Sequence, residues 1–364
     1  MQIEILPKDF IISPTFETGG ELQSDFVIKA IRLVNDSNTS IELISLTFEL
    51  LAGSSIIKSI YYEEDALSAK LANGCDKILK SGFWGLKSML GSTIQWNCEK
   101  ITGSTELLPG KETAIVNEFF IVVNKPVVDD IRLRICYAQD GNKCEQQASV
   151  PVVDYKTKND YIFPVKGIWQ VNGNYDCIGA HRTQYSMEFA IDLGQLNQEG
   201  MCVWKDEMKD DDFLAYGKDI LAIADGEVID CFHDAYWRIN FPHDTASDEE
   251  KEERAKIQKE VGRLPIQCGN YVVLKHSNGE YSFYGHMIKN SSTVQKGALV
   301  KQGDIIGKIG NVGFSGSPHL HFQLMDGPDF YSARGLPCHF TNIIDTFRNN
   351  LSLIQEEYTV VCAL

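Results

Sequence analysis

Short runs of β-branched and aliphatic residues, separated by polar turns, dominate the first part of the chain. DFVIKAIRLVND and SIELISLTFELL are two such runs, with turn residues between them, and AIVNEFFIVV and IRLRICYA continue the pattern. Short strands at this spacing are typical of an antiparallel β-sandwich. We therefore predict an immunoglobulin-like β-sandwich over residues 1–153, interrupted by a helix in EEDALSAKLANGCDKILKSGFWGLKSML.

A short polar stretch, DYKTKND, predicts a linker, and the chain then returns to short strands with Gly and Asp turns. ILAIADGEVID predicts a hairpin around Asp225-Gly226, and GNYVVLKHSNGEYSFYGHM predicts another around Asn278-Gly279. Both dipeptides favour the tight turns of β-hairpins. HLHFQLMD is a further strand candidate. A second β-rich domain is therefore expected over residues 154–364.

One segment of this second half, SDEEKEERAKIQKEVGRLP, departs from the strand pattern. Ser247 and Glu250 have the spacing of a capping box, and Gly262 and Pro265 are residues that end helices. Its thin apolar stripe consists of Ile257, Val261 and Leu264. We predict one exposed helical insert over about 247–264, docked by that stripe, with a solvated charged face. A role in gating a substrate site is the alternative.

The amino-acid composition and the net charge limit the kinds of protein that this chain can be. The 364 residues are 43% hydrophobic, which is enough for two domain cores, and the formal net charge of −16 disfavours binding to nucleic-acid phosphates. Ten scattered cysteines without a CxxC pair favour free thiols in a reducing compartment. Neither a signal peptide in MQIEILPKDFIISPTFE nor an apolar run of about 18 residues is evident. We expect a cytoplasmic protein without a membrane span, or an envelope or extracellular one if another export route or a missing leader applies.

Two histidines within HLHFQLMD suggest chemistry. Alternate residues of a strand share a face, so His319 and His321 would lie about 6–7 Å apart on one side. Leu320 and Phe322 would point into a core. A buried polar group without a partner costs about 1–3 kcal/mol. Zinc is one efficient partner for both rings, and ordinary hydrogen bonds are the alternative.

Further N and O donors stand in similar settings. His286 ends the probable strand SFYGHM, Asp192 lies in the apolar strand MEFAIDLG, and His181 lies upstream in CIGAHRTQ. An uncompensated carboxylate in an apolar strand would be expensive. A catalytic zinc site needs three protein ligands and an open fourth position. Additional histidines would then move a proton or stabilise an oxyanion.

YGHM, VKQGDIIGKIGNVGFSGSPHLHF and FAIDLG followed by ILAIADGEV resemble the lysostaphin-type zinc metalloendopeptidases, over roughly residues 160–345. The resemblance implies a mainly antiparallel β domain that hydrolyses peptide bonds in peptidoglycan stems or cross-bridges, or in other glycine-rich peptides. It implies one Zn²⁺ per chain, held by His181, Asp192 and His321. It also implies that His286 and His319 are catalytic, one as general base and the other as oxyanion stabiliser.

Alternatives remain at this point. Ten residues separate His181 from Asp192, more than in the family pattern, and this spacing motivates a catalytically inactive member acting as a binding or regulatory module. A phosphocarrier with two facing histidines is a third possibility, although it gives Asp192 no role. Tyr175 is a candidate oxyanion donor. The other histidines are interpreted as surface or packing residues: His233, His243, His276 and His339.

Overall fold

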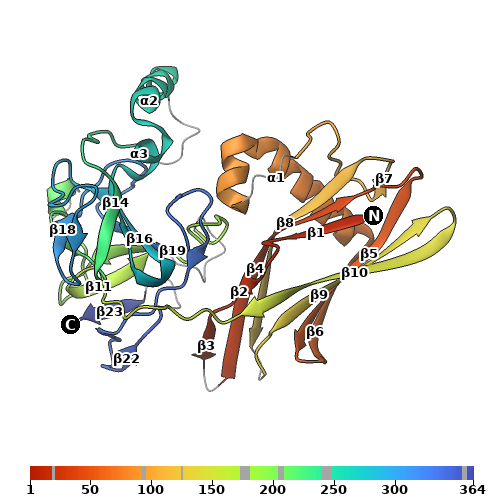
Figure 1. The fold of residues 1–364 in the computed structure, drawn as a ribbon, viewed down its shortest axis with the longest axis horizontal. Helices are drawn as coiled ribbons and strands as arrows, with labels where there is room; N and C mark the ends of the chain where they lie inside the picture. Colours follow the sequence, from red (N-terminus) through yellow and green to blue (C-terminus); the bar gives the residue numbers. More distant parts are fainter. Residues whose placement is uncertain are drawn as a thin grey trace. The chain divides into compact units, whose positions relative to one another are not determined.

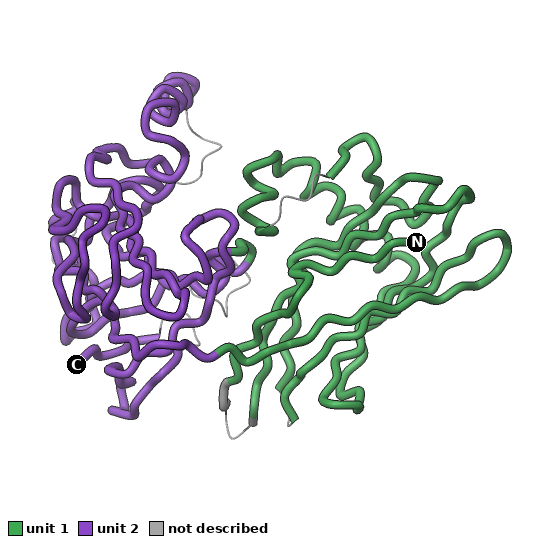
Figure 2. The backbone as a smooth tube through the Cα atoms, viewed as in Figure 1, with its two compact units in different colours: residues 1–155, 183–185 green, residues 156–182, 186–364 purple. Residues whose placement is uncertain are grey.

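The computed structural model describes residues 1–18, 21–91, 96–123, 126–172, 181–203, 209–239, 247–354 and 359–364. Tyr175 and His243 therefore lie outside the described residues. The chain forms two compact units (Figure 2). Unit 1 comprises Met1–Tyr155 with Thr183–Tyr185, and unit 2 comprises Lys156–Arg182 with Ser186–Leu364.

Unit 1 consists of two β-sheets and a helix (Figure 1). The first sheet contains β1 (Gln2–Leu6), β3 (Thr15–Thr18), β4 (Glu21–Val34) and β8 (Glu112–Val123). The second contains β2 (Ile11–Ile12), β5 (Ile41–Ala52), β6 (Ser55–Glu63), β7 (Glu106–Leu107), β9 (Asp130–Gln139) and β10 (Asn142–Val153). All of these pairs are antiparallel except β2 with β10.

The two sheets of unit 1 share one hydrophobic core. Phe120 of β8 stacks on Phe26 of β4, with ring centroids 5.2 Å apart, and meets Phe48 of β5 edge-on at 5.1 Å. Aromatic contacts of this kind add to the stabilisation from apolar burial. Two layers thus pack around a single core, as a β-sandwich requires, while the immunoglobulin-like sandwich itself stays a prediction.

Helix α1 (Glu64–Leu90) covers the other face of the first sheet, and its presence confirms the predicted helix. A kink divides it at Gly82, which has a positive φ of 61°. The helix approaches β8 closely at Gly74, where a Cβ atom would lie 1.9 Å from the Ala114 carbonyl oxygen. Only glycine fits this contact. None of the helices in the described ranges is both long and apolar enough to cross a membrane.

Unit 2 is built on antiparallel strands. Its described residues form an 11-stranded sheet and a two-stranded one. The large sheet has the order β17-β14-β15-β16-β19-β12-β11-β23-β21-β22, with β20 paired to β19, and the small sheet pairs β13 with β18. The strand bounds are β11 Gly167–Asn172, β12 Ile191–Gln195, β13 Asp219–Leu221, β14 Gly226–Phe232, β15 Asn270–Lys275, β16 Tyr281–Met287, β17 Leu299–Val300, β18 Ile305–Lys308, β19 Leu320–Met325, β20 Gly335–Leu336, β21 Ile343–Ile344, β22 Asn350–Leu351 and β23 Val360–Ala363. The prediction of a mainly β protein is confirmed.

The two predicted hairpins have different outcomes. Strands β15 and β16 pair antiparallel around Asn278-Gly279, and both turn residues have positive φ, so this hairpin is confirmed. The prediction of a hairpin at Asp225-Gly226 is wrong. The two strands that flank this turn do not pair with each other, because β13 pairs with β18 while β14 pairs with β15 and β17. The Asp225 carboxylate instead accepts hydrogen bonds from Gln302 N and Lys301 Nζ. The conformation of this turn is therefore held by hydrogen bonds from a loop that is far away in the sequence.

The helical insert contains two helices. Helix α2 (Asp248–Val261) begins with the predicted capping box: Ser247 Oγ accepts from Glu250 N, and the Glu250 carboxylate accepts from Ser247 N. No residue of α2 is buried. A second helix, α3 (Arg263–Cys268), follows and contains Pro265 in its first turn, where proline's missing N–H is tolerated. The single helix predicted over about 247–264 thus differs from the structure, and docking comes from α3, through Leu264.

A buried carboxylate, Glu280, joins the start of unit 2 to the β15–β16 hairpin. It is fully buried and accepts hydrogen bonds from Tyr161 Oη at 2.8 Å and Asn159 Nδ2 at 2.7 Å. The backbone N–H of Lys158 donates to the same carboxylate at 3.0 Å. Removing a shared buried acceptor leaves its donors without their partner.

We expect a Glu280→Ala variant to lower the free energy of unfolding by about 3 kcal/mol, because several donors, among them the buried Tyr161 hydroxyl, lose one buried acceptor. Urea denaturation measures this loss. The Glu280→Gln variant keeps an acceptor oxygen of similar shape and is expected to lose less stability. An alanine variant within about 0.5 kcal/mol of the wild type would contradict the structural role.

Candidate metal centre

Two neighbouring strands of unit 2 place an aspartate and a histidine opposite each other. Asp192 lies in β12 and His321 in β19, and the antiparallel register pairs them directly. Directly opposed residues of antiparallel strands have Cβ atoms about 4.5–5.5 Å apart. The sheet register thus joins two side chains that are 129 residues apart in the sequence.

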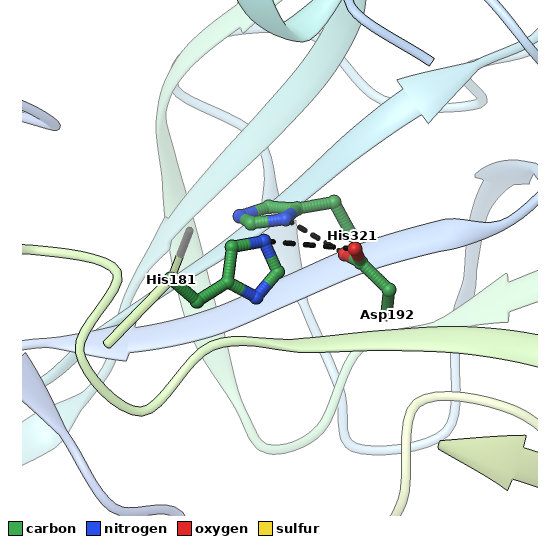
Figure 3. A group of neighbouring side chains, drawn as sticks. All are labelled: His181, Asp192 and His321. Carbon is green, nitrogen blue, oxygen red and sulfur yellow. Dashed lines mark hydrogen bonds and ion pairs between the residues drawn. The ribbon is translucent and has the colours of Figure 1, made fainter. Parts of the chain in front are cut away.

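His181 completes a compact group with these two residues (Figure 3). His321 Nδ1 lies 3.0 Å from Asp192 Oδ1, and His181 Nε2 lies 3.5 Å from Asp192 Oδ2. One ligand atom from each of the three residues lies within 4.8 Å of the others. The ten residues between His181 and Asp192 therefore do not keep them apart.

The donor set fits Zn²⁺. Two imidazole nitrogens and one carboxylate oxygen are donors that zinc accepts, and three protein ligands leave a fourth position open. Burial raises the pKa of Asp192, but the nearby His181 and His319 rings and the hydrogen bond from His321 outweigh it and hold this pKa below its usual range. The carboxylate is therefore ionised at neutral pH, as a metal ligand must be.

Gln323, which the sequence interpretation missed, orients the His321 ring. It is fully buried on the same strand, and its Oε1 lies 2.9 Å from His321 Nε2. The Gln323 amide nitrogen donates to Met325 Sδ, which leaves the oxygen for histidine. Because a carbonyl oxygen only accepts, Nε2 carries a hydrogen, which leaves Nδ1, 3.0 Å from Asp192 Oδ1, as the ring nitrogen that would bind a metal. A glutamine two positions after His321, in an otherwise apolar strand, was the available signal.

Replacing Gln323 by leucine is expected to weaken zinc binding by about 10–100-fold, the usual cost of removing a group that orients a metal-binding histidine. Competition with a chromogenic chelator measures this affinity. The Gln323→Glu variant retains an oxygen acceptor and is expected to bind zinc more tightly than the leucine variant. Equal affinities of the leucine variant and the wild type would show that His321 needs no such support.

His286 and His319 lie beside this group with their rings tilted by 54° to each other and the ring centroids 4.7 Å apart. Nδ1 of His286 donates to the Val312 carbonyl at 2.8 Å, and Nδ1 of His319 donates to the Ser317 carbonyl at 2.7 Å. In both rings Nδ1 therefore carries a hydrogen, and Nε2 is the nitrogen left to exchange a proton with a bound molecule. His319 Nε2 lies 3.6 Å from Asp192 Oδ1. His319 precedes β19 rather than lying within it, in contrast to the strand placement predicted for both histidines.

The setting of His286 keeps its ring neutral. Burial, together with the neighbouring His319 and His321, lowers the pKa of His286 well below its usual value. Its backbone has a φ of 61°, which few residues other than glycine adopt. Gly310 N donates to the His286 carbonyl at 3.0 Å and helps to hold this conformation. Such backbone strain is most often found at functional sites.

The five residues line one pocket of about 270 Å³. The rest of its wall is formed by Met187, Gln267, Cys268, Phe314, Gly316 and Phe330. A concave, largely apolar site with a few convergent polar groups is the usual form of a ligand-binding pocket. The histidines predicted to be packing or surface residues, His233, His276 and His339, are absent from this described lining. His276 is buried and hydrogen-bonded to Asp225 O and Ser282 Oγ.

The antiparallel β domain thus places a three-donor group beside two further histidines. The sequence is more specific: residues 255–331 match Peptidase family M23. This match to part of the chain confirms the resemblance predicted from the sequence. His286, His319 and His321 fall inside the matched residues, while His181 and Asp192 precede them.

Each curated relative matches a short stretch of the chain. An uncharacterized metalloprotease of Buchnera aphidicola is 39% identical over 62 residues, 17% of this chain and 16% of that protein. The peptidoglycan DD-endopeptidase ShyA of Vibrio cholerae is 44% identical over 58 residues, 16% of this chain and 13% of that protein. A crystal structure of a zinc containing peptidase from Vibrio cholerae has a TM-score of 0.29 at 14% identity, covering 89% of this chain and 86% of that one. The matched segments thus span less than a fifth of the curated relatives' length.

Proposed function

We propose that unit 2 is a zinc-dependent endopeptidase that hydrolyses peptide bonds in peptidoglycan stems or cross-bridges. The observation that carries the proposal is the meeting of three metal-type donors with two further histidines in one pocket. The M23 match and the peptidoglycan DD-endopeptidases among the relatives support the substrate class.

His181, Asp192 and His321 would hold the metal. When bound, zinc supplies a Lewis acid that polarises the peptide carbonyl and makes water easier to deprotonate. The largely apolar wall of the pocket limits access of bulk water and strengthens electrostatic interactions inside it.

His286 is assigned the proton transfers. Its depressed pKa keeps Nε2 unprotonated, so this nitrogen is free to accept a proton from the attacking water as the new C–O bond forms. The same nitrogen then returns that proton to the amine that leaves when the C–N bond breaks. His319 is assigned the developing negative charge: a proton on its Nε2, stabilised by Asp192 at 3.6 Å, would be donated to the carbonyl oxygen.

Two measurements on the same preparation test this proposal. Metal mass spectrometry is expected to find about one zinc per chain, and liquid chromatography is expected to show cleavage of a DD-cross-linked stem-peptide dimer or a pentaglycine peptide. Absence of zinc after reconstitution, together with no cleavage of either peptide, would overturn it. Zinc without cleavage would favour an inactive binding module.

A further inference from the structure

The helical insert contributes one hydrogen-bonding side chain to the pocket that holds the metal centre. That residue is Gln267, near the end of α3. Its neighbours in the wall are mainly apolar, with Cys268 from the same helix and Phe314 and Phe330 from later segments. A single amide in such a wall is placed to fix the orientation of a bound molecule.

The backbone at Gln267 is held firmly against the loop that leads to His319. Phe314 N donates to the Gln267 carbonyl oxygen at 2.7 Å. Gly313 passes so close that a Cβ atom there would lie 2.6 Å from the same oxygen. Upstream, Trp237 Nε1 donates to the Pro265 carbonyl at 3.2 Å. These contacts fix the end of α3 in unit 2.

A tyrosine also fixes the side chain of Gln267. Tyr331 Oη donates to Gln267 Oε1 at 3.1 Å. Burial raises the pKa of Tyr331, so the phenol keeps the proton that it donates. With the amide oxygen used as an acceptor, the Gln267 NH₂ group, which offers only donors, remains for the pocket.

We propose that Gln267 Nε2 donates a hydrogen bond to a backbone carbonyl of the peptide substrate and so sets the position of the peptide beside the metal centre. This inference rests on the proposed endopeptidase function. A neutral amide between apolar walls suits a neutral carbonyl better than a carboxylate, whose desolvation would be costly and whose charge would face that of Asp192. Because the donor is held at both its backbone and its side chain, little entropy is lost when it binds.

Steady-state kinetics of Gln267→Ala and Gln267→Glu test the inference, with the stem-peptide dimer or pentaglycine peptide that the wild type cleaves. The glutamate variant keeps the acceptor for Tyr331 but removes the NH₂ donors. We expect KM to rise about tenfold in both variants, the loss of roughly one hydrogen bond, with kcat changed less than about twofold. Zinc content and the midpoint of thermal unfolding are expected to match the wild type.

Gln295→Glu is the matched control, because it makes the same chemical change at an exposed loop residue of unit 2. Its KM is expected to equal that of the wild type. An unchanged KM in both Gln267 variants of an active enzyme would overturn this inference and leave the endopeptidase proposal standing. Loss of zinc without a rise in KM would also overturn it, by assigning Gln267 to support of the metal centre. A wild type that cleaves neither peptide would overturn the proposed function and this inference with it.

Discussion

An Asp192→Ala variant is expected to lose its zinc and its peptidase activity together, with activity falling by more than about 100-fold. Asp192 contacts both of the other proposed ligands, since its two oxygens lie 3.5 Å from His181 Nε2 and 3.0 Å from His321 Nδ1. Removing a side chain that only orients a metal-binding residue lowers metal affinity by about 10–100-fold. Removing a metal-binding residue itself should therefore lower that affinity by more. Metal mass spectrometry and peptide hydrolysis on one preparation measure both effects.

Asp234→Asn is a suitable control for this experiment. Asp234 is exposed and forms a surface ion pair with Lys289 at 2.8 Å, an interaction worth about 0–1 kcal/mol. The control is therefore expected to keep both zinc and activity. A full zinc complement in Asp192→Ala would refute the ligand set, whatever happened to the rate.

The sequence alone was enough to select the candidate site residues, but it did not show which of them lie next to one another. His319 and His321 were recognisable because polar rings in an apolar run require partners. That Asp192 lies opposite His321 depends on the strand register, which no local pattern encodes. The position of His181 likewise depends on how the chain turns before β12.

Errors arose where distant contacts decided the local conformation. Asp225-Gly226 has the composition of a hairpin turn, but the Asp225 carboxylate accepts hydrogen bonds from Lys301 and Gln302, which are 76 and 77 residues away. Gln323 was missed because an isolated amide in an apolar strand has no distinctive pattern until its partner, His321, is seen beside it. The capping box predicted at Ser247 and Glu250 is confirmed, because its hydrogen bonds join residues only three positions apart and depend on the local sequence alone.

The His319→Ala variant is expected to separate metal binding from chemistry. His319 is assigned no coordination role, since the group with mutual separations under 4.8 Å is formed by His181, Asp192 and His321. Its zinc content should therefore equal that of the wild type, while kcat falls by about 10²–10⁴-fold, the usual contribution of a positioned proton donor or acceptor. A His233→Asn variant, which alters a histidine outside the pocket lining, is expected to leave kcat unchanged.

Combining His319→Ala with His286→Ala tests whether the two adjacent rings act together. If both serve one transition state, the double variant should be little slower than the slower single variant, because groups that act as a unit are strongly non-additive. Their ring separation of 4.7 Å and the matching Nδ1 hydrogen bonds to backbone carbonyls favour this result. Single-turnover kinetics on the zinc-loaded proteins provides the rates. Multiplicative losses would assign the two histidines to separate steps, and a wild-type kcat in His319→Ala would leave His286 as the sole proton carrier.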